Sequence, residues 1–157
     1  MITSQTPKPI TEAGRCIPKP PAQVQKRKVL VTDDCSDTLD LIKDVIEGWG
    51  HEAVVFKSKV TALEKLREIK PDLVTTDLYA PVLGGFDFIL WVKKLDPSIP
   101  VIVISGNLDP RYDPDSEKAK RAFRLGACAC LQKPFKIAHL RKIIEQVLTT
   151  RASNTEI

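Results

Sequence analysis

Short apolar runs alternate with segments of helical periodicity from residue 28 onward. Each run is five or six residues long, and most are rich in Val and Ile, which is typical of strands that are buried on both faces of a sheet. The pattern predicts strands over residues 28–32, 52–56, 72–77, 100–105 and 128–132.

The segments between these runs carry apolar residues three and four positions apart, which is the spacing of an amphipathic helix. Leu39, Ile42 and Ile46 follow it in the first segment, and Ser58 precedes the second segment as a candidate helix cap. The pattern predicts helices over residues 38–49, 60–69, 86–95, 115–125 and 137–148.

Strands that alternate with helices predict parallel β-α-β crossovers, and therefore an α/β fold whose parallel sheet has helices on both faces. The glycine and proline residues that end helices or precede strands agree with these elements. Gly50 ends the first helix, Pro71 precedes the third strand and Gly126 ends the fourth helix.

Composition and charge divide the chain into one domain and two flanks. The 157 residues leave room for a single domain of ordinary size. Residues 1–28 hold six basic residues and one acidic residue, a net charge of +5, whereas the rest of the chain has a net charge of −1, which gives +4 in total. The same residues hold five of the twelve prolines. We expect a flexible basic extension over residues 1–27, a folded domain over 28–150 and a C-terminal tail over 151–157.

Hydropathy excludes a membrane protein, because no apolar run reaches the roughly 18 residues of a span. The N-terminus lacks the apolar stretch of a secretory signal, so we expect a cytoplasmic protein with reduced cysteines. Cys128 and Cys130 lie two residues apart on one predicted strand, and we expect both to be small buried side chains rather than a metal site.

Chemically useful side chains follow four of the five predicted strands. Asp33 and Asp34 follow the first strand, Asp77 ends the third, Ser105 ends the fourth and Lys133 follows the fifth. Because the carboxyl ends of parallel strands meet at one edge of a sheet, we expect these five side chains to lie close together.

Three neighbouring carboxylates repel one another, and a hard cation such as Mg²⁺ removes that penalty. Mg²⁺ with few protein ligands usually partners a phosphate, and a carboxylate can act as a nucleophile that forms an aspartyl phosphate. The cation and Lys133 would then neutralise the transferring phosphoryl oxygens, and the Ser105 hydroxyl could donate a hydrogen bond to one of them.

Four stretches of the chain resemble the receiver domain of bacterial response regulators. They are VLVTDD (29–34), DLYAPVLGG (77–85), VIVISG (101–106) and GACACLQKPF (126–135). The resemblance covers about residues 28–150, and it implies a flavodoxin-like fold of five β-α units with the strand order 2-1-3-4-5.

The resemblance also implies a role for each site residue. Asp77 corresponds to the phosphorylated aspartate. Asp34 corresponds to a direct Mg²⁺ ligand, Asp33 to its acidic partner and the backbone carbonyl of Tyr79 to a further ligand. A second set follows the fourth and fifth strands: Ser105 as the switch hydroxyl, and Lys133 as the phosphate-binding lysine in a cis peptide with Pro134.

Two departures from the family pattern concern how a signal leaves the site. Cys130 stands where the family usually has an aromatic residue, and a small thiol cannot replace the motion of a ring. Residues 106–118 form a longer segment than is usual in the family, and we expect a solvated loop with Asp115 or Ser116 capping the next helix.

These observations favour a stand-alone phosphoacceptor module of a two-component phosphorelay. It would take a phosphoryl group onto Asp77 from a sensor histidine kinase or a histidine phosphotransfer protein, and signal to a downstream protein by changed contacts, without a DNA-binding domain. It would catalyse only its own phosphorylation and dephosphorylation. Two alternatives stay open: an adaptor that binds nucleic acid or an anionic surface through the basic extension, and an aspartyl-nucleophile phosphohydrolase, in which Tyr79 would replace the expected second aspartate.

Overall fold

A computed structural model gives the fold of the chain. It describes residues 25–79, 82–106, 108 and 117–155. Its strands are β1 (Lys28–Thr32), β2 (Glu52–Phe56), β3 (Leu73–Thr76), β4 (Val101–Ser105) and β5 (Ala129–Gln132). They form a single parallel sheet in the order β2-β1-β3-β4-β5, so the predicted fold and strand order are confirmed.

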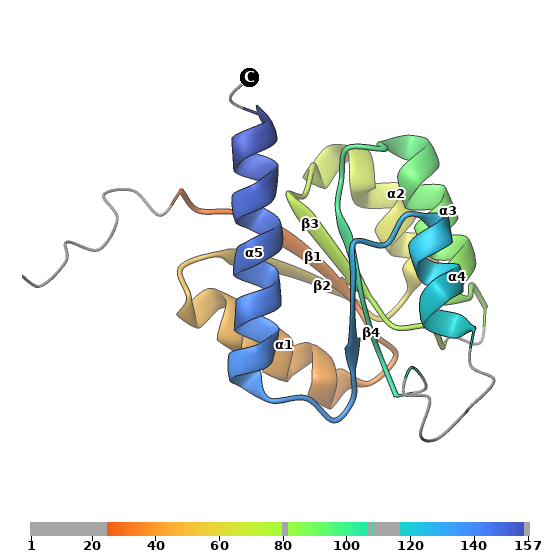
Figure 1. The fold of residues 1–157 in the computed structure, drawn as a ribbon, viewed down its shortest axis with the longest axis horizontal. Helices are drawn as coiled ribbons and strands as arrows, with labels where there is room; N and C mark the ends of the chain where they lie inside the picture. Colours follow the sequence, from red (N-terminus) through yellow and green to blue (C-terminus); the bar gives the residue numbers. More distant parts are fainter. Residues whose placement is uncertain (1–24, 80–81, 107, 109–116, 156–157) are drawn as a thin grey trace, which may run out of the picture.

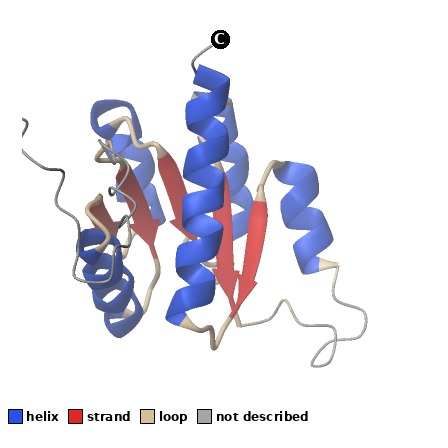
Figure 2. Cartoon of the chain, turned by 60° about the vertical axis from the view of Figure 1, so that its left-hand side comes forward, coloured by secondary structure: helices blue, strands red, loops and turns tan. Residues whose placement is uncertain are grey.

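Helices cover both faces of this sheet (Figures 1 and 2). They are α1 (Ser36–Gly48), α2 (Lys59–Ile69), α3 (Gly85–Leu95), α4 (Lys118–Leu125) and α5 (Ile137–Thr155). Helices α1 and α5 pack on one face, and α2, α3 and α4 pack on the other. Among the described residues, none of these helices is long and apolar enough to cross a bilayer.

The central strands are buried on both sides, as their apolar sequence predicts. In β1, Val29 and Val31 point into the core beneath α1 and α5, whereas Leu30 points into the core beneath α2 and α3. All three side chains are fully buried. Burying one such side chain contributes about 1.5–3 kcal/mol, so this alternation fixes the register of the sheet.

The helix ends agree with the predicted signals in most places. Ser58 caps α2, because its hydroxyl accepts a hydrogen bond from the Thr61 amide at 3.2 Å. Gly126 ends α4 with a left-handed φ of 118°. Helix α5 continues to Thr155 instead of ending at residue 148. Helix α4 begins at Lys118, and the expected caps Asp115 and Ser116 lie outside the described residues.

The expectation that Cys128 and Cys130 are buried was wrong. Cys128 is exposed and Cys130 is only partly covered, because β5 lies at the edge of the sheet and Cys128 precedes the strand. Both thiols are free, as is the exposed Cys35, whereas Cys16 lies outside the described residues. Partial burial raises the pKa of Cys130 to about 11, so this thiol stays protonated.

Candidate functional site

The three predicted carboxylates meet at the carboxyl end of the sheet. Asp33 and Asp34 follow β1, Asp77 follows β3, and these two strands are neighbours with Thr32 paired to Thr76. One oxygen from each carboxylate lies within 4.8 Å of the other two. The three carboxylates therefore converge at one sheet edge, as expected from their positions after the strands.

Asp77 is buried in the cluster, with only 4% of its surface exposed. Burial raises the pKa of Asp77 to about 6, and the negative charge of Asp33 adds to the rise, whereas Lys59 opposes it. A carboxylate with this pKa is mostly ionised at neutral pH, so it is available as a nucleophile.

Lys59 is a site residue that the sequence analysis missed. It begins α2, its side chain is 1% exposed, and its Nζ lies 2.6 Å from Oδ1 of Asp77. The same nitrogen donates to the backbone carbonyl of Tyr79 at 3.1 Å. The sequence did hold one indication, because Lys59 lies shortly after β2, and the carboxyl end of β2 meets the same sheet edge. Sequence spacing alone would still not have separated Lys59 from Lys57, which is exposed.

Lys133 reaches the site from the end of β5, as predicted, and there it pairs with Asp33. Its Nζ lies 2.6 Å from Oδ2 of Asp33, whose other oxygen accepts a hydrogen bond from the Cys35 amide at 2.9 Å. The peptide between Lys133 and Pro134 is cis, as the resemblance implied. About a quarter of the Lys133 side chain, 26%, is exposed, so this lysine borders solvent.

Ser105 and Tyr79 complete the predicted set. Ser105 is the last residue of β4 and is 5% exposed, and its carbonyl accepts a hydrogen bond from the Lys133 amide at 2.9 Å. The Tyr79 ring is exposed, whereas its backbone carbonyl is held toward the site by Lys59. Only the carbonyl of Tyr79 is therefore placed for chemistry at Asp77.

Gly85 lets α3 start directly against the segment that carries Asp77. A Cβ atom on Gly85 would lie 2.3 Å from the Asp77 carbonyl oxygen and 2.6 Å from Cα of Leu78. No side chain fits at that distance, which explains why a glycine stands at this position of the DLYAPVLGG stretch. The close approach fixes the position of Asp77 relative to α3.

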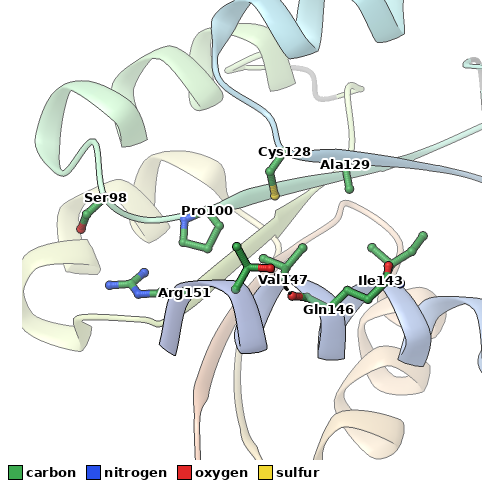
Figure 3. A pocket seen from close by; sticks show the side chains of 9 residues that line it. Ser98, Pro100, Cys128, Ala129, Ile143, Gln146, Val147 and Arg151 are labelled. Atoms are coloured by element: carbon green, nitrogen blue, oxygen red, sulfur yellow. Dashed lines mark hydrogen bonds between the residues drawn. The ribbon is translucent and has the colours of Figure 1, made fainter. Parts of the chain in front are cut away.

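A separate hollow of about 800 Å³ lies at the other end of the sheet. Figure 3 shows its lining, which includes Pro100 before β4, Cys128 before β5, and Val147 and Arg151 of α5. These residues lie at the amino ends of the strands, so the hollow is distinct from the carboxylate cluster.

Residues 29–145 match the sequence model of the response regulator receiver domain. The chain is 30% identical over 122 residues to the chemotaxis protein CheY of Thermotoga maritima, a match that covers 77% of this chain and 97% of that protein. The solved structure of a CheY-like receiver domain protein from Methanospirillum hungatei has the same fold, with a TM-score of 0.76 at 22% identity over 83% of this chain and 99% of that one.

The chain therefore belongs to the response-regulator receiver family, and it is a phosphoacceptor receiver module of two-component signalling. Some relatives are much longer. A protein-glutamate methylesterase/protein-glutamine glutaminase of Burkholderia thailandensis is 38% identical over 109 residues, but the match covers only 29% of that protein. Membership of the family supports a signalling role for the receiver domain that the two proteins share. The enzymatic activity in the relative's name is a property of that protein alone.

Proposed function

We propose that Asp77 is the phosphoacceptor and that Asp33, Asp34, Asp77 and the Tyr79 carbonyl hold Mg²⁺ beside it. The observation that carries this proposal is the convergence of one oxygen from each of the three carboxylates within 4.8 Å. Family membership adds that such a site takes part in phosphoryl transfer.

The donor set fits Mg²⁺, because carboxylate and carbonyl oxygens are the hard ligands that this ion prefers. The Tyr79 carbonyl and Oδ1 of Asp77 both contact the nitrogen of Lys59, so the two oxygens face one point in space. When bound, Mg²⁺ would neutralise charge on the transferring phosphoryl group.

In the proposed reaction, a carboxylate oxygen of Asp77 attacks the phosphorus of a phosphohistidine on a sensor histidine kinase or a phosphotransfer protein. The new bond joins oxygen to phosphorus, and the phosphorus–nitrogen bond breaks, returning its electron pair to the imidazole. Lys133, which borders solvent, pairs with one phosphoryl oxygen. The Ser105 hydroxyl donates a hydrogen bond to another phosphoryl oxygen. The altered contacts at this edge then change binding to a downstream protein.

Exposed cysteines such as Cys35 and Cys128 stay reduced in the cytoplasm, where disulfides are disfavoured. We place this phosphotransfer in the cytoplasm.

The direct test is incubation of the full chain with acetyl phosphate and Mg²⁺, followed by intact-mass measurement. The wild type should gain one phosphoryl group that hydroxylamine removes, and Asp77→Asn should gain none. Asp87→Asn is the matched control, because Asp87 is an exposed aspartate in the first turn of α3. Labelling that persists in Asp77→Asn would assign the acceptor to another residue.

The two alternative functions are less well supported. A phosphohydrolase needs a general acid two residues after the nucleophile, and Tyr79 occupies that position with its ring in solvent. Binding of nucleic acid or an anionic surface would depend on residues 1–27, most of which lie outside the described part of the chain. Salt-dependent binding that disappears when residues 1–26 are deleted would favour that second role.

A further inference from the structure

A positive charge of the chain itself lies between two of the oxygens proposed to bind Mg²⁺. The Lys59 ammonium contacts Oδ1 of Asp77 at 2.6 Å and the carbonyl oxygen of Tyr79 at 3.1 Å. A cation that touches both oxygens occupies the point toward which they converge. An ion ligated by the same two oxygens would have to lie close to the same point.

The local structure by itself disfavours a charged lysine at this position. Lys59 is in the first turn of α2, where the partial positive charge of a helix N-terminus disfavours a cation, and that turn has no acidic residue. Its side chain is also almost completely buried, which is costly for an ammonium without partners. Lys57, two residues earlier, is exposed. The burial of Lys59 therefore depends on the oxygens of Asp77 and Tyr79.

The charges of the site show why Lys59 and Mg²⁺ exclude each other. Lys133 pairs with Asp33, and Lys59 pairs with Asp77, which leaves Asp34 as the exposed carboxylate of the cluster. A divalent ion bound to Asp77 would lie beside the Lys59 ammonium in a buried space, where like charges repel strongly. The long lysine stem allows the ammonium to leave the oxygens without unfolding α2.

We propose that Lys59 is a tethered cation that occupies the magnesium position of the receiver site, so that Mg²⁺ binds by displacing it. This inference rests on the proposed function, since it takes the same oxygens as the Mg²⁺ ligands. It makes Lys59 a residue that sets the metal affinity of the site and keeps the charge of Asp77 paired while no metal is bound.

Isothermal titration of Mg²⁺ into the full-length chain tests this directly. Lys59→Met should bind Mg²⁺ about tenfold more tightly than the wild type, because no charge-assisted hydrogen bonds must be broken first. Lys57→Met, which removes an exposed lysine from the same loop, should bind as the wild type does. Lys133→Met removes a charge that pairs with Asp33, so it should give a smaller gain than Lys59→Met.

Thermal unfolding gives a second reading of the same competition. In EDTA, Lys59→Met should melt below the wild type, because Asp77 loses its buried partner. Added Mg²⁺ should then raise the melting temperature more in the variant than in the wild type. Lys59→Gln, which keeps a neutral donor, replaces Lys59→Met if the latter does not fold.

The outcomes separate this inference from the proposed function. Equal or weaker Mg²⁺ binding by Lys59→Met, or an equal gain in Lys133→Met, would overturn the role of Lys59 while leaving the metal site intact. If none of the chains bound Mg²⁺, both this inference and the proposed metal site would be wrong. The assignment of Asp77 as the phosphoacceptor is decided separately, by the mass measurement on the wild type and Asp77→Asn.

Discussion

The ammonium of Lys133 lies 2.6 Å from Oδ2 of Asp33, whereas the buried partner of Asp77 is Lys59. The two lysines thus neutralise different carboxylates of one cluster. Lys133 is the more exposed of the two, with 26% of its side chain accessible against 1% for Lys59. An incoming phosphoryl group can therefore draw Lys133 away from Asp33 with little loss of packing.

Replacing Lys133 by Met should slow phosphorylation of Asp77. The variant lacks a cation that can pair with the developing negative charge, which we expect to lower the initial rate by about tenfold or more. The measurement is the time course of the added phosphoryl mass with acetyl phosphate and Mg²⁺. Lys136→Met, an exposed lysine just beyond the site, serves as the control. An unchanged rate in Lys133→Met would remove this lysine from the transfer step.

Mg²⁺ should raise the melting temperature of the wild type, because the ion binds the folded carboxylate cluster and not the unfolded chain. Asp34→Ala should lose this gain. Since Asp34 is exposed, the substitution removes no packing, and relief of repulsion should let the metal-free variant melt at or above the wild type. Asp40→Ala, at an exposed position of α1, should keep the full response. The same response in Asp34→Ala would mean that the ion binds elsewhere.

Gly85→Ala should damage both stability and phosphorylation. The added methyl group would meet the Asp77 carbonyl oxygen at 2.3 Å, so the backbone must shift, at a cost of about 1–3 kcal/mol. Gly84→Ala is a matched control, because a Cβ atom there has no neighbour within 4 Å. Denaturant unfolding and the phosphorylation rate should separate the two variants. Equal behaviour of both would show that the segment carrying Asp77 can move freely.

The fold could be predicted from the sequence because its signal is repeated along the chain. Residues such as Val29, Leu30 and Val31 form a short, Val-rich apolar run, which is typical of a strand covered on both faces, and all three are buried. The carboxylate cluster was predictable for a related reason, since Asp33 and Asp77 directly follow strands, and the carboxyl ends of parallel strands meet at a common edge.

Lys59 was not predictable in this way, because its role depends on the direction of one long side chain at the start of a helix. Sequence periodicity places Lys59 near the site, but it does not say whether Lys59 or Lys57 turns inward. The exposure of Cys128 was missed for a different reason: the predicted strand began at residue 128, whereas β5 begins at Ala129, so Cys128 precedes the strand instead of packing within it.

The stability of the domain should fall in mild acid through His51. This residue is 8% exposed, and its Nδ1 accepts a hydrogen bond from the Arg27 amide at 3.1 Å. Burial lowers the pKa of His51, although the nearby carboxylates of Glu145 and Asp72 partly oppose this, whereas the charge of Arg27 adds to it. The unfolded chain therefore takes up a proton first, and stability present above about pH 6.5 is lost as the pH falls below that value.

His51→Asn keeps a hydrogen-bond acceptor without a titrating ring, so its free energy of unfolding should vary less than that of the wild type between roughly pH 5 and 7. Denaturant unfolding at several pH values in EDTA measures this. The exposed His139→Asn is the matched control. Parallel pH profiles for wild type and His51→Asn would show that the acid sensitivity arises elsewhere.

Gln132 connects the end of β5 to the segment that follows Ser105. Its Oε1 accepts a hydrogen bond from the Leu108 amide at 2.8 Å, and its Nε2 donates to the carbonyls of Gly106 and Lys133 at 2.7 Å each. The side chain makes these bonds while its backbone stays paired with Ser105 in the sheet. Rotation of this one side chain would therefore free Gly106 and Leu108 from β5 without disturbing the strand.

We expect activation to appear mainly in residues 106–125, with little change around Cys130. The small thiol of Cys130 can move only a small volume when the site changes. A phosphoryl group that attracts Ser105 and Lys133 would instead shift the backbone at Gly106 and Lys133, which are the two carbonyl partners of Gln132. Hydrogen exchange with and without beryllofluoride, a phosphoryl mimic, should show its largest differences in residues 106–125. In Gln132→Ala, the Leu108 amide should exchange faster even without the mimic, because its acceptor is gone. Differences centred on residues 128–132, with none in 106–125, would instead place the switch in β5.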